Sequence, residues 1–245
     1  MRISIELTPR DSDSLVCDLR AIREKLPAAD TINIPDLLRF SVRSWEGCGI
    51  ARAFFGRAVP HIRAMDVDPH APLAMLACLR KHGIKEVLVV SGDKPQEMSH
   101  KVYPTRNLDI IAKFKHEAPD LTIYATLDPY RQSVSGERDL LRAKRDAGAD
   151  GFFTQPVFDL RLMEIYAELA EPERIFWGAS PVLSERSMNY WETKNRVVFP
   201  SGFEPTMEWN RRQAAKVFAK AKELGSSVYF MPIKTNVCEY LEGVI

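Results

Sequence analysis

Short apolar runs alternate along the chain with longer amphipathic stretches. Three of these runs follow a glycine closely, and the pairs are Gly83 with 86–90, Gly148 with 150–154 and Gly225 with 227–231. A glycine just after a helix takes the left-handed conformation that ends it, and strands buried on both faces lose the alternation of half-exposed strands. The repeat therefore predicts helices that alternate with buried parallel strands.

Eight strands are predicted when the same pattern is followed along the whole chain, with a helical pattern after each of the first seven. Their ranges are 2–7, 30–34, 58–63, 86–91, 121–126, 150–155, 174–179 and 227–233. Eight parallel strands close a (β/α)8 TIM barrel, and such barrels commonly use about 250 residues. We therefore expect an α/β chain that forms one barrel domain over residues 1–245.

The helical pattern at 208–224 places its apolar residues on one face and its basic residues on the other, which is typical of a solvated helix face rather than a binding patch. The stretch before it, 180–208, is the least regular part of the chain. We expect its short apolar run, Val197–Phe199, to be a loop rather than a strand.

Charge and composition exclude several classes of protein. Lys and Arg number 34 and Asp and Glu number 33, so the formal charge of +1 lacks the basic excess of nucleic-acid-binding proteins. No apolar run approaches the roughly 18 residues of a membrane span, and charge appears too early for a signal peptide. We expect a cytoplasmic protein that binds neither nucleic acid nor membrane.

The four cysteines are scattered without a C-x-x-C pair: Cys17, Cys48, Cys78 and Cys238. This spacing favours reduced core thiols over disulfides or metal ligands. The chain also contains no P-loop and no G-x-G-x-x-G, and Thr8-Pro9-Arg10 follows the first strand where an open doubly wound sheet would carry glycines. Nucleotide binding by those two routes is not supported.

Residues at the carboxyl ends of barrel strands meet at one mouth although they are far apart in sequence. The residues predicted there are Glu6, Asn33, His61, Asp93, Thr126, Gln155, Ser180 and Lys234. Glu6 lies between apolar residues of a strand, where an unpaired carboxylate is costly, so it is either a working acid or base or a structural hydrogen-bond partner.

The other strand-end residues carry weaker chemical signals. Asp93 is either a charged site residue or a turn residue after Gly92, and His61 has no metal-ligand spacing around it. The amide of Gln155 can donate and accept hydrogen bonds toward a heterocycle. Lys234 at the last strand is a minor candidate for Schiff-base chemistry, and no serine-nucleophile motif occurs.

Several motifs resemble those of methylenetetrahydrofolate reductase, nearly from end to end. The densest match is the segment from Asp146 to Asp159, which is similar to the family's AGAD…TQ…FD motif. The other matches are Ser4-Ile-Glu6-Leu-Thr-Pro9 for the family's F-E-F-x-P, Pro60-His61 for its P-H-L-T-C, and Ser91-Gly92-Asp93-Lys94-Pro95 for its R/T-G-D-x-P. Their order and spacing are also those of the family.

The resemblance implies a barrel that uses FAD to pass hydride from NAD(P)H to 5,10-methylenetetrahydrofolate. It makes Glu6 the general acid, and it places Asp93 near flavin and pterin, where its charge favours the cationic intermediate. Gln155 and Phe158 would lie at the folate. The residues that it implies at FAD are His61, Asp93, Tyr103 and Lys144.

The chain departs from the family pattern mainly around the implied FAD site. Asn33 stands where many members have threonine, Ile62-Arg63-Ala64 replaces L-T-C, Ser91 replaces Arg or Thr, and Leu127–Tyr130 stands near the place of Y-P-x-x-H. These changes predict weak or absent FAD. They leave two alternatives open: a pterin-binding barrel that transfers a one-carbon group without flavin, and a non-catalytic folate-binding subunit. A homo-oligomer or a partner subunit is compatible with all three.

Overall fold

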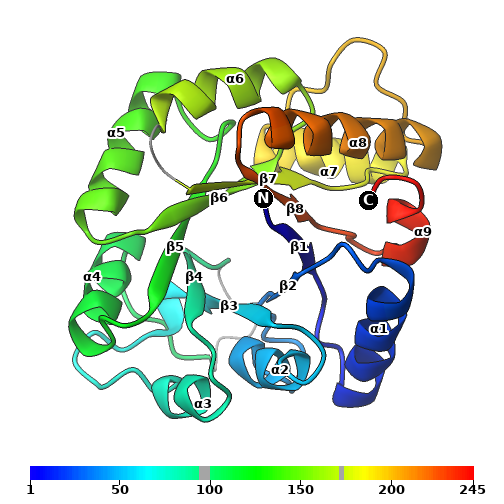
Figure 1. Ribbon diagram of the computed structural model, residues 1–245. Coiled ribbons are helices and arrows are strands. Elements are labelled where there is room, and N and C mark those ends of the chain that lie inside the picture. The colour runs from blue at the N-terminus through cyan, green and yellow to red at the C-terminus, as the bar shows by residue number, and fades with distance from the viewer. Residues whose placement is uncertain (94–99, 171–173) are drawn as a thin grey trace.

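The strands of this computed structural model run parallel and pair in chain order, and β1 also pairs with β8, so the sheet closes into a barrel (Figure 1). The structure describes residues 1–93, 100–170 and 174–245. The strands in these ranges are β1 (Ile3–Glu6), β2 (Thr31–Ile34), β3 (Arg57–Arg63), β4 (Glu86–Val90), β5 (Thr122–Leu127), β6 (Gly151–Pro156), β7 (Arg174–Ala179) and β8 (Ser227–Phe230). The predicted TIM-barrel fold is confirmed.

Helices surround the barrel as the sequence predicts (Figure 1). They are α1 (Ser12–Lys25), α2 (Ser44–Ala51), α3 (Leu76–Lys81), α4 (Asn107–Glu117), α5 (Val134–Asp146), α6 (Leu160–Leu169), α7 (Glu185–Asn195), α8 (Met207–Glu223) and α9 (Val237–Leu241), with a short 3-10 helix at Ala64–Asp66. The predicted helix at 208–224 corresponds to α8, and Val197–Phe199 is a loop as expected.

Helix α7 lies inside the stretch that the sequence indicated as irregular. Its first turn is capped by Ser184, whose side chain accepts a hydrogen bond from the backbone N–H of Ser187, but Trp191 is its one buried residue. A helix that buries so little has no apolar stripe from which periodicity could predict it.

Apolar side chains form two layers, one outside the strands and one inside the barrel. Side chains alternate between the faces of a strand, so Ile3 and Ile5 of β1 pack against the helices while Ser4 and Glu6 take the inward positions. The inner layer consists of Val59, Leu88, Tyr124, Phe153, Phe176, Tyr229 and Met231. Because this layer fills the barrel, ligands can reach the strands only at its two ends.

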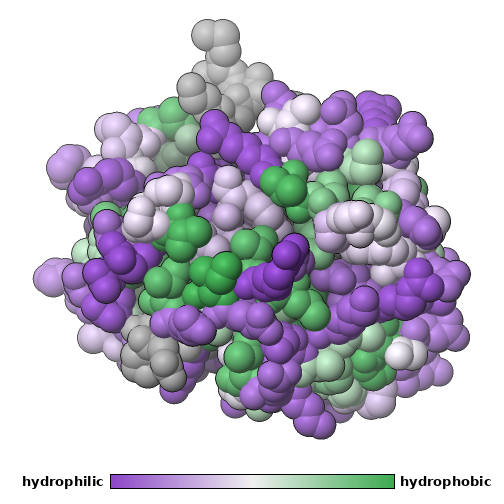
Figure 2. All heavy atoms as spheres, turned by 90° about the horizontal axis from the view of Figure 1, so that it is seen from above, coloured by the Kyte–Doolittle hydropathy of each residue, from purple (hydrophilic) through white to green (hydrophobic). Residues whose placement is uncertain are grey.

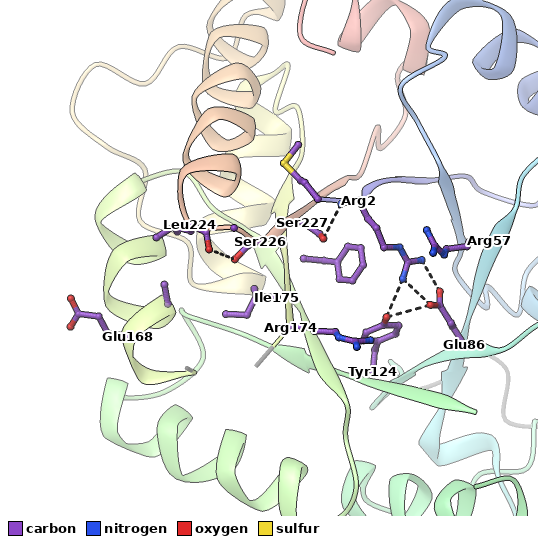
Figure 3. A pocket seen from close by; sticks show the side chains of 14 residues that line it. Arg2, Arg57, Glu86, Tyr124, Glu168, Arg174, Ile175, Leu224, Ser226 and Ser227 are labelled. Carbon is purple, nitrogen blue, oxygen red and sulfur yellow. Dashed lines mark hydrogen bonds and ion pairs between the residues drawn. The ribbon is translucent and has the colours of Figure 1, made fainter. Parts of the chain in front are cut away.

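The amino-terminal end of the barrel is closed by a buried ion pair. Both guanidinium nitrogens Nη1 and Nη2 of Arg2 contact the Glu86 carboxylate, at 2.8 and 2.7 Å, and Nη1 also donates to the Tyr124 hydroxyl at 3.1 Å (Figure 3). Arg57 and Arg174 lie beside this pair, along a cavity of about 720 Å³. Each of the two side chains thus has a counter-ion beneath the apolar layer, where an unpaired charge would be costly.

The outer surface carries mixed polarity, and on the face in Figure 2 hydrophilic residues surround smaller hydrophobic groups. Within the described ranges, no helix is long and apolar enough to cross a membrane. All four cysteines are free thiols. Only Cys48 is fully buried, whereas Cys17 is exposed, so the prediction that the cysteines are core thiols is wrong for Cys17 because it points from α1 into solvent.

Removing the carboxylate of the Arg2–Glu86 pair should leave a buried guanidinium without its partner. We expect Glu86→Ala to lower the free energy of unfolding by about 3 kcal/mol, measured by urea denaturation. The matched control is Asp120→Ala, because the pair of Asp120 with Lys85 is largely exposed and contributes little. Equal effects of the two substitutions would show that the Arg2–Glu86 pair does not stabilise the barrel end.

Candidate active site at the barrel mouth

Glu6 ends β1 at the carboxyl end of the barrel and its side chain is 16% exposed. The hydroxyl of Tyr229, from β8, donates a hydrogen bond to Glu6 Oε2. Burial raises the pKa of the Glu6 carboxyl to about 7, and the Tyr229 hydrogen bond opposes part of that rise because it favours the carboxylate. Near neutral pH, Glu6 can therefore both hold and release a proton.

His61 of β3 lies next to this carboxyl. Its Nε2 atom is 4.0 Å from Glu6 Oε2, and its ring meets the Tyr229 ring edge-on with centroids 6.4 Å apart. The ring is 7% exposed, and burial lowers its pKa to about 3, so the imidazole is neutral near pH 7. Its buried Nε2 has no hydrogen-bond partner among the described residues.

A cleft of about 460 Å³ opens beside Glu6, between the loops that follow β1, β2 and β8. Arg39 and Phe40 line it from the second loop, with the guanidinium 4.9 Å from the ring centroid, and Ile233 and Lys234 line it from the third. Arg10 and Asp18, also at the cleft, form an exposed ion pair at 3.4 Å. The cleft combines one buried acid, an apolar wall and a cationic rim.

Asp93 follows β4 directly and its side chain is exposed. Its backbone carbonyl accepts a hydrogen bond from Arg63 Nη2 at 2.6 Å, which fixes the turn. Gly92 has a φ of +84°, and a Cβ there would lie 3.2 Å from atoms of Arg63 and Met65, so both conformation and space require glycine. Lys94 and Pro95 of the same motif lie outside the described residues.

The remaining strand-end residues are mostly engaged in the scaffold. Gln155 is half-buried where the register between β6 and β7 shifts. Ser180 donates to the Met231 carbonyl at 2.9 Å, and the amide of Asn33 donates to the Ser4 hydroxyl. Of the strand-end residues predicted to share the mouth, the structure places Glu6 and Lys234 on one cleft and His61 beside Glu6.

Phe158 follows β6 and is buried. It is 2% exposed and packs in an aromatic cluster that includes Trp191, Phe199 and Phe203. The cluster packs the segment between β7 and α8, including α7, against Phe158. The structure gives Phe158 packing contacts, and its place at the substrate stays a prediction.

Lys144, on α5, is engaged with the scaffold in this structure, and its assignment as an FAD contact stays a prediction. Its Nζ donates to the backbone carbonyl of Thr126 at 2.5 Å and is 4.0 Å from Glu137 Oε1. The residue is 4% exposed, and burial lowers the pKa of its ammonium group. Glu137 in turn accepts from the backbone N–H of Asp128 at 3.0 Å, so these residues fix the loop after β5.

Arg63 occupies the side of the mouth that the family resemblance assigns to FAD. It stands at the end of β3, is 9% exposed, and its Nε contacts Asp66 Oδ2 at 2.7 Å. Asp66 also lies 3.2 Å from His100 Nε2 and 4.0 Å from Arg43 Nη2. The Arg63 guanidinium thus already has its counter-ion and its carbonyl partner, and it is packed against Gly92.

Tyr103, the fourth implied FAD contact, lies next to the same network. Its backbone N–H donates to the Met65 carbonyl at 2.8 Å, and Lys101 Nζ lies 4.6 Å from its ring centroid. Of the four implied contacts, Asp93 touches Arg63, Tyr103 contacts Met65 and Lys101, His61 is buried beside Glu6, and Lys144 is bonded to Thr126. The described residues therefore do not offer FAD one open site, because the Arg63 guanidinium is already paired and 9% exposed and the Lys144 ammonium is already engaged.

Two residues of this mouth were missed by sequence reasoning alone. Tyr229 could have been found, because Ser227, Tyr229 and Met231 alternate inward along β8 and the middle one carries the polar tip. Arg63 was noted only as a departure from a motif. The three-residue spacing between Arg63 and Asp66 could have suggested their ion pair. That the Arg63 side chain points into the barrel is known only from its position on β3.

Comparisons with known proteins agree with this architecture. A family model described as Methylenetetrahydrofolate reductase matches residues 50–211, more than half of the chain. An uncharacterized protein from Clostridium thermocellum, solved binding two copies of 5-methyl-5,6,7,8-tetrahydrofolic acid, superposes with a TM-score of 0.66 at 11% identity, over 99% of this chain and 93% of that chain.

Two further solved structures share the fold. A 2,3-dimethylmalate lyase of the PEP mutase/isocitrate lyase superfamily has a TM-score of 0.60 at 12% identity, over 96% of this chain and 75% of that one. An oxaloacetate acetylhydrolase has a TM-score of 0.59 at 12% identity, over 95% and 75%. At such identities the structural likeness shows the barrel alone, whereas the family match covers the motif-bearing middle of the sequence. The chain belongs to the methylenetetrahydrofolate reductase family.

Proposed function

We propose that the chain, acting as one barrel domain, binds a reduced folate in the cleft beside Glu6 and that Glu6 exchanges a proton with it. The observation that carries the proposal is a buried carboxyl with a pKa of about 7 at the edge of a ligand-sized cleft. Family membership supports a folate ligand, as does the folate bound by the Clostridium thermocellum protein.

The chemistry of the cleft suits the parts of a folate. Its volume of about 460 Å³ lies in the range of about 300–1,000 Å³ that is usual for small-molecule sites. Phe40 offers an aromatic face for a ring, and Arg39 and Lys234 are exposed cations at the rim. The glutamate tail of a folate carries two carboxylates, which these cations would attract.

The reaction that family membership favours is reduction of 5,10-methylenetetrahydrofolate. The protonated Glu6 would give its proton to N10 as the bond from N10 to the methylene carbon breaks, which leaves an iminium cation at N5. Hydride from NAD(P)H would then reduce the methylene carbon and give 5-methyltetrahydrofolate and NAD(P)⁺. Asp93 and Gln155 remain candidates for contacts to the cation and the pterin.

FAD is left out of this proposal, because Arg63 at the end of β3 is already paired with Asp66 and offers no free donor on the side of the mouth that the resemblance assigns to FAD. The Arg63–Asp66 ion pair also favours a second candidate function. In it, the barrel transfers a one-carbon unit between a reduced folate and an acceptor without redox chemistry. Proton exchange at Glu6 serves both reactions. A requirement for NAD(P)H distinguishes them.

The raised pKa of Glu6 predicts how stability depends on pH. The pKa rises from 4.5 in a free side chain to about 7 in the folded protein, so the folded state binds more protons between these values and stability falls as the pH rises through them. Glu6→Gln removes the ionising group, so it should stabilise the protein by up to about 3 kcal/mol more at pH 8 than at pH 4.5. Urea unfolding at both pH values measures this.

The control for that experiment is Glu24→Gln, on the exposed side of α1, whose effect should not differ between the two pH values. An effect of Glu6→Gln that is the same at pH 4.5 and pH 8 would mean that folding does not raise the pKa of Glu6, and the proposed proton donor would be lost.

The cationic rim predicts a difference between ligands with and without a glutamate tail. Arg39→Ala should weaken binding of 5-methyltetrahydrofolate roughly tenfold, the scale of one charge-assisted hydrogen bond, and leave 6-methyltetrahydropterin unaffected because it has no tail. Calorimetric titration measures both ligands. Arg106→Ala is the matched control, since Arg106 pairs with Asp109 on α4. Failure of the wild-type chain to bind either ligand would remove the folate proposal.

The Arg63 network predicts that the purified chain holds no FAD. After incubation with FAD and desalting, the protein should show no flavin absorbance, and any folate-dependent oxidation of NAD(P)H should be unchanged by added FAD. One equivalent of retained flavin would contradict this and restore the flavin-dependent reaction. Folate-dependent product formed without any NAD(P)H would instead support one-carbon transfer.

A further inference from the structure

We propose that Tyr229 is a positioning residue that places the exchangeable proton of Glu6 on Oε1, the carboxyl oxygen that Tyr229 does not contact. The Tyr229 hydroxyl donates to Oε2, and no described residue forms a hydrogen bond with Oε1. The inference rests on the acid role of Glu6 proposed above, and it specifies which oxygen delivers the proton and which residue selects it.

A neutral carboxyl has one oxygen that accepts hydrogen bonds and one that donates. Tyr229 is 3% exposed, and its pKa is raised well above the ordinary value, first by burial and then by the neighbouring Glu6, so its hydroxyl keeps its hydrogen. With the Glu6 proton on Oε1, that hydrogen is satisfied by Oε2. With the proton on Oε2, two hydrogens would compete for one contact, and one buried donor would lose its partner.

Among the described residues around Glu6, Tyr229 is the one whose side chain forms a hydrogen bond with the carboxyl. The titratable and charged groups that face the carboxyl or its cleft are Tyr229 from β8, His61 from β3, Arg10 and Asp18 from the side of β1 and α1, Arg39 from the loop after β2, and Lys234 from the loop after β8. His61 is 4.0 Å from Oε2, too far for a hydrogen bond, and its neutral ring adds no charge.

The inward neighbours on β1 and β2 are Ser4 and Asn33, which bond to one another and not to the carboxyl. The groups beneath Glu6 are therefore uncharged, and Asn33 Oδ1 is an acceptor with no partner among the described residues. Oε1 has no hydrogen-bond partner among the described residues, and Glu6 lines the cleft. A proton on Oε1 would therefore be available to a ligand in the cleft.

The experiment follows the Glu6 carboxyl by NMR in protein labelled with ¹³C at the glutamate side-chain carbonyl, with the Glu6 signal assigned from its loss in Glu6→Gln. Tyr229→Phe removes a bond that favours the carboxylate, so the ionisation constant of Glu6 should fall about tenfold and its titration midpoint should move to higher pH. Tyr240→Phe, which removes another buried hydroxyl, on α9, should leave the midpoint unchanged.

A midpoint that does not move in Tyr229→Phe would overturn the proposal. Should that variant fail to fold, labelling the hydroxyl-bearing ring carbon of tyrosine in the wild-type protein tests the same contact: the Tyr229 signal should titrate with the Glu6 midpoint and lose that titration in Glu6→Gln. A Tyr229 signal that is independent of Glu6 would also overturn it.

These titrations need no folate, so they stand apart from the proposed function. If the chain binds no folate while the midpoint moves, the contact is real and the proposed substrate is wrong. If folate is turned over, Tyr229→Phe should lower kcat more than KM and move the pH profile in the direction of the NMR midpoint. A merely structural tyrosine would lower the amount of folded protein without moving that profile.

Discussion

The filled interior of the closed barrel is the constraint on which the rest of this structure depends. Eight strands enclose a space that their inward side chains fill, and here aromatic residues of β5 to β8 occupy it, with Phe153 and Phe176 stacked at 4.1 Å between ring centroids. Polar groups on inward positions must therefore lie at one end or the other. At the amino-terminal end they form the Arg2–Glu86 pair, and at the carboxyl-terminal end they form the site.

The carboxyl groups at the two ends of the barrel have opposite electrostatic environments. Glu86 meets a guanidinium through both of its oxygens, so its charge is compensated within the protein. Glu6 meets only a neutral hydroxyl and a neutral imidazole, so its environment favours the protonated form. The same residue type is thus a structural anion at one end and the proposed proton donor at the other. The two carboxyl groups differ because Glu86 has a charged partner, Arg2, whereas Glu6 has only uncharged neighbours, and not because of their burial alone.

The sequence was sufficient for the fold because barrel strands carry a strong and repeated signal. Buried apolar runs, three of them after glycines, predicted the eight strands. Helix α7 was not predicted, and it buries only Trp191. The site was predictable only where a residue's place on its strand decides its role, as for Glu6 and His61. The contacts of Lys144 and Phe158 could not be predicted, because a motif gives only the order of residues along the chain and not the side of the sheet on which each side chain packs.

The charged side chains at the mouth fall into two groups: those above β3 and β4 are paired with one another, and those around β1 and β8 are not. This difference favours binding of an anionic ligand around β1 and β8. Above β3 and β4, Arg63 and Asp66 neutralise each other, and Arg43 is held by Asp36, so an incoming phosphate or flavin ring would have to break ion pairs to gain its own. Around β1 and β8, Arg39 and Lys234 have no carboxylate partner within the described residues, and an anionic ligand gains their attraction without that cost. Arg63, on β3, thus belongs to the part of the mouth whose charges are already paired, whereas the cations beside Glu6 are free to attract an anionic ligand.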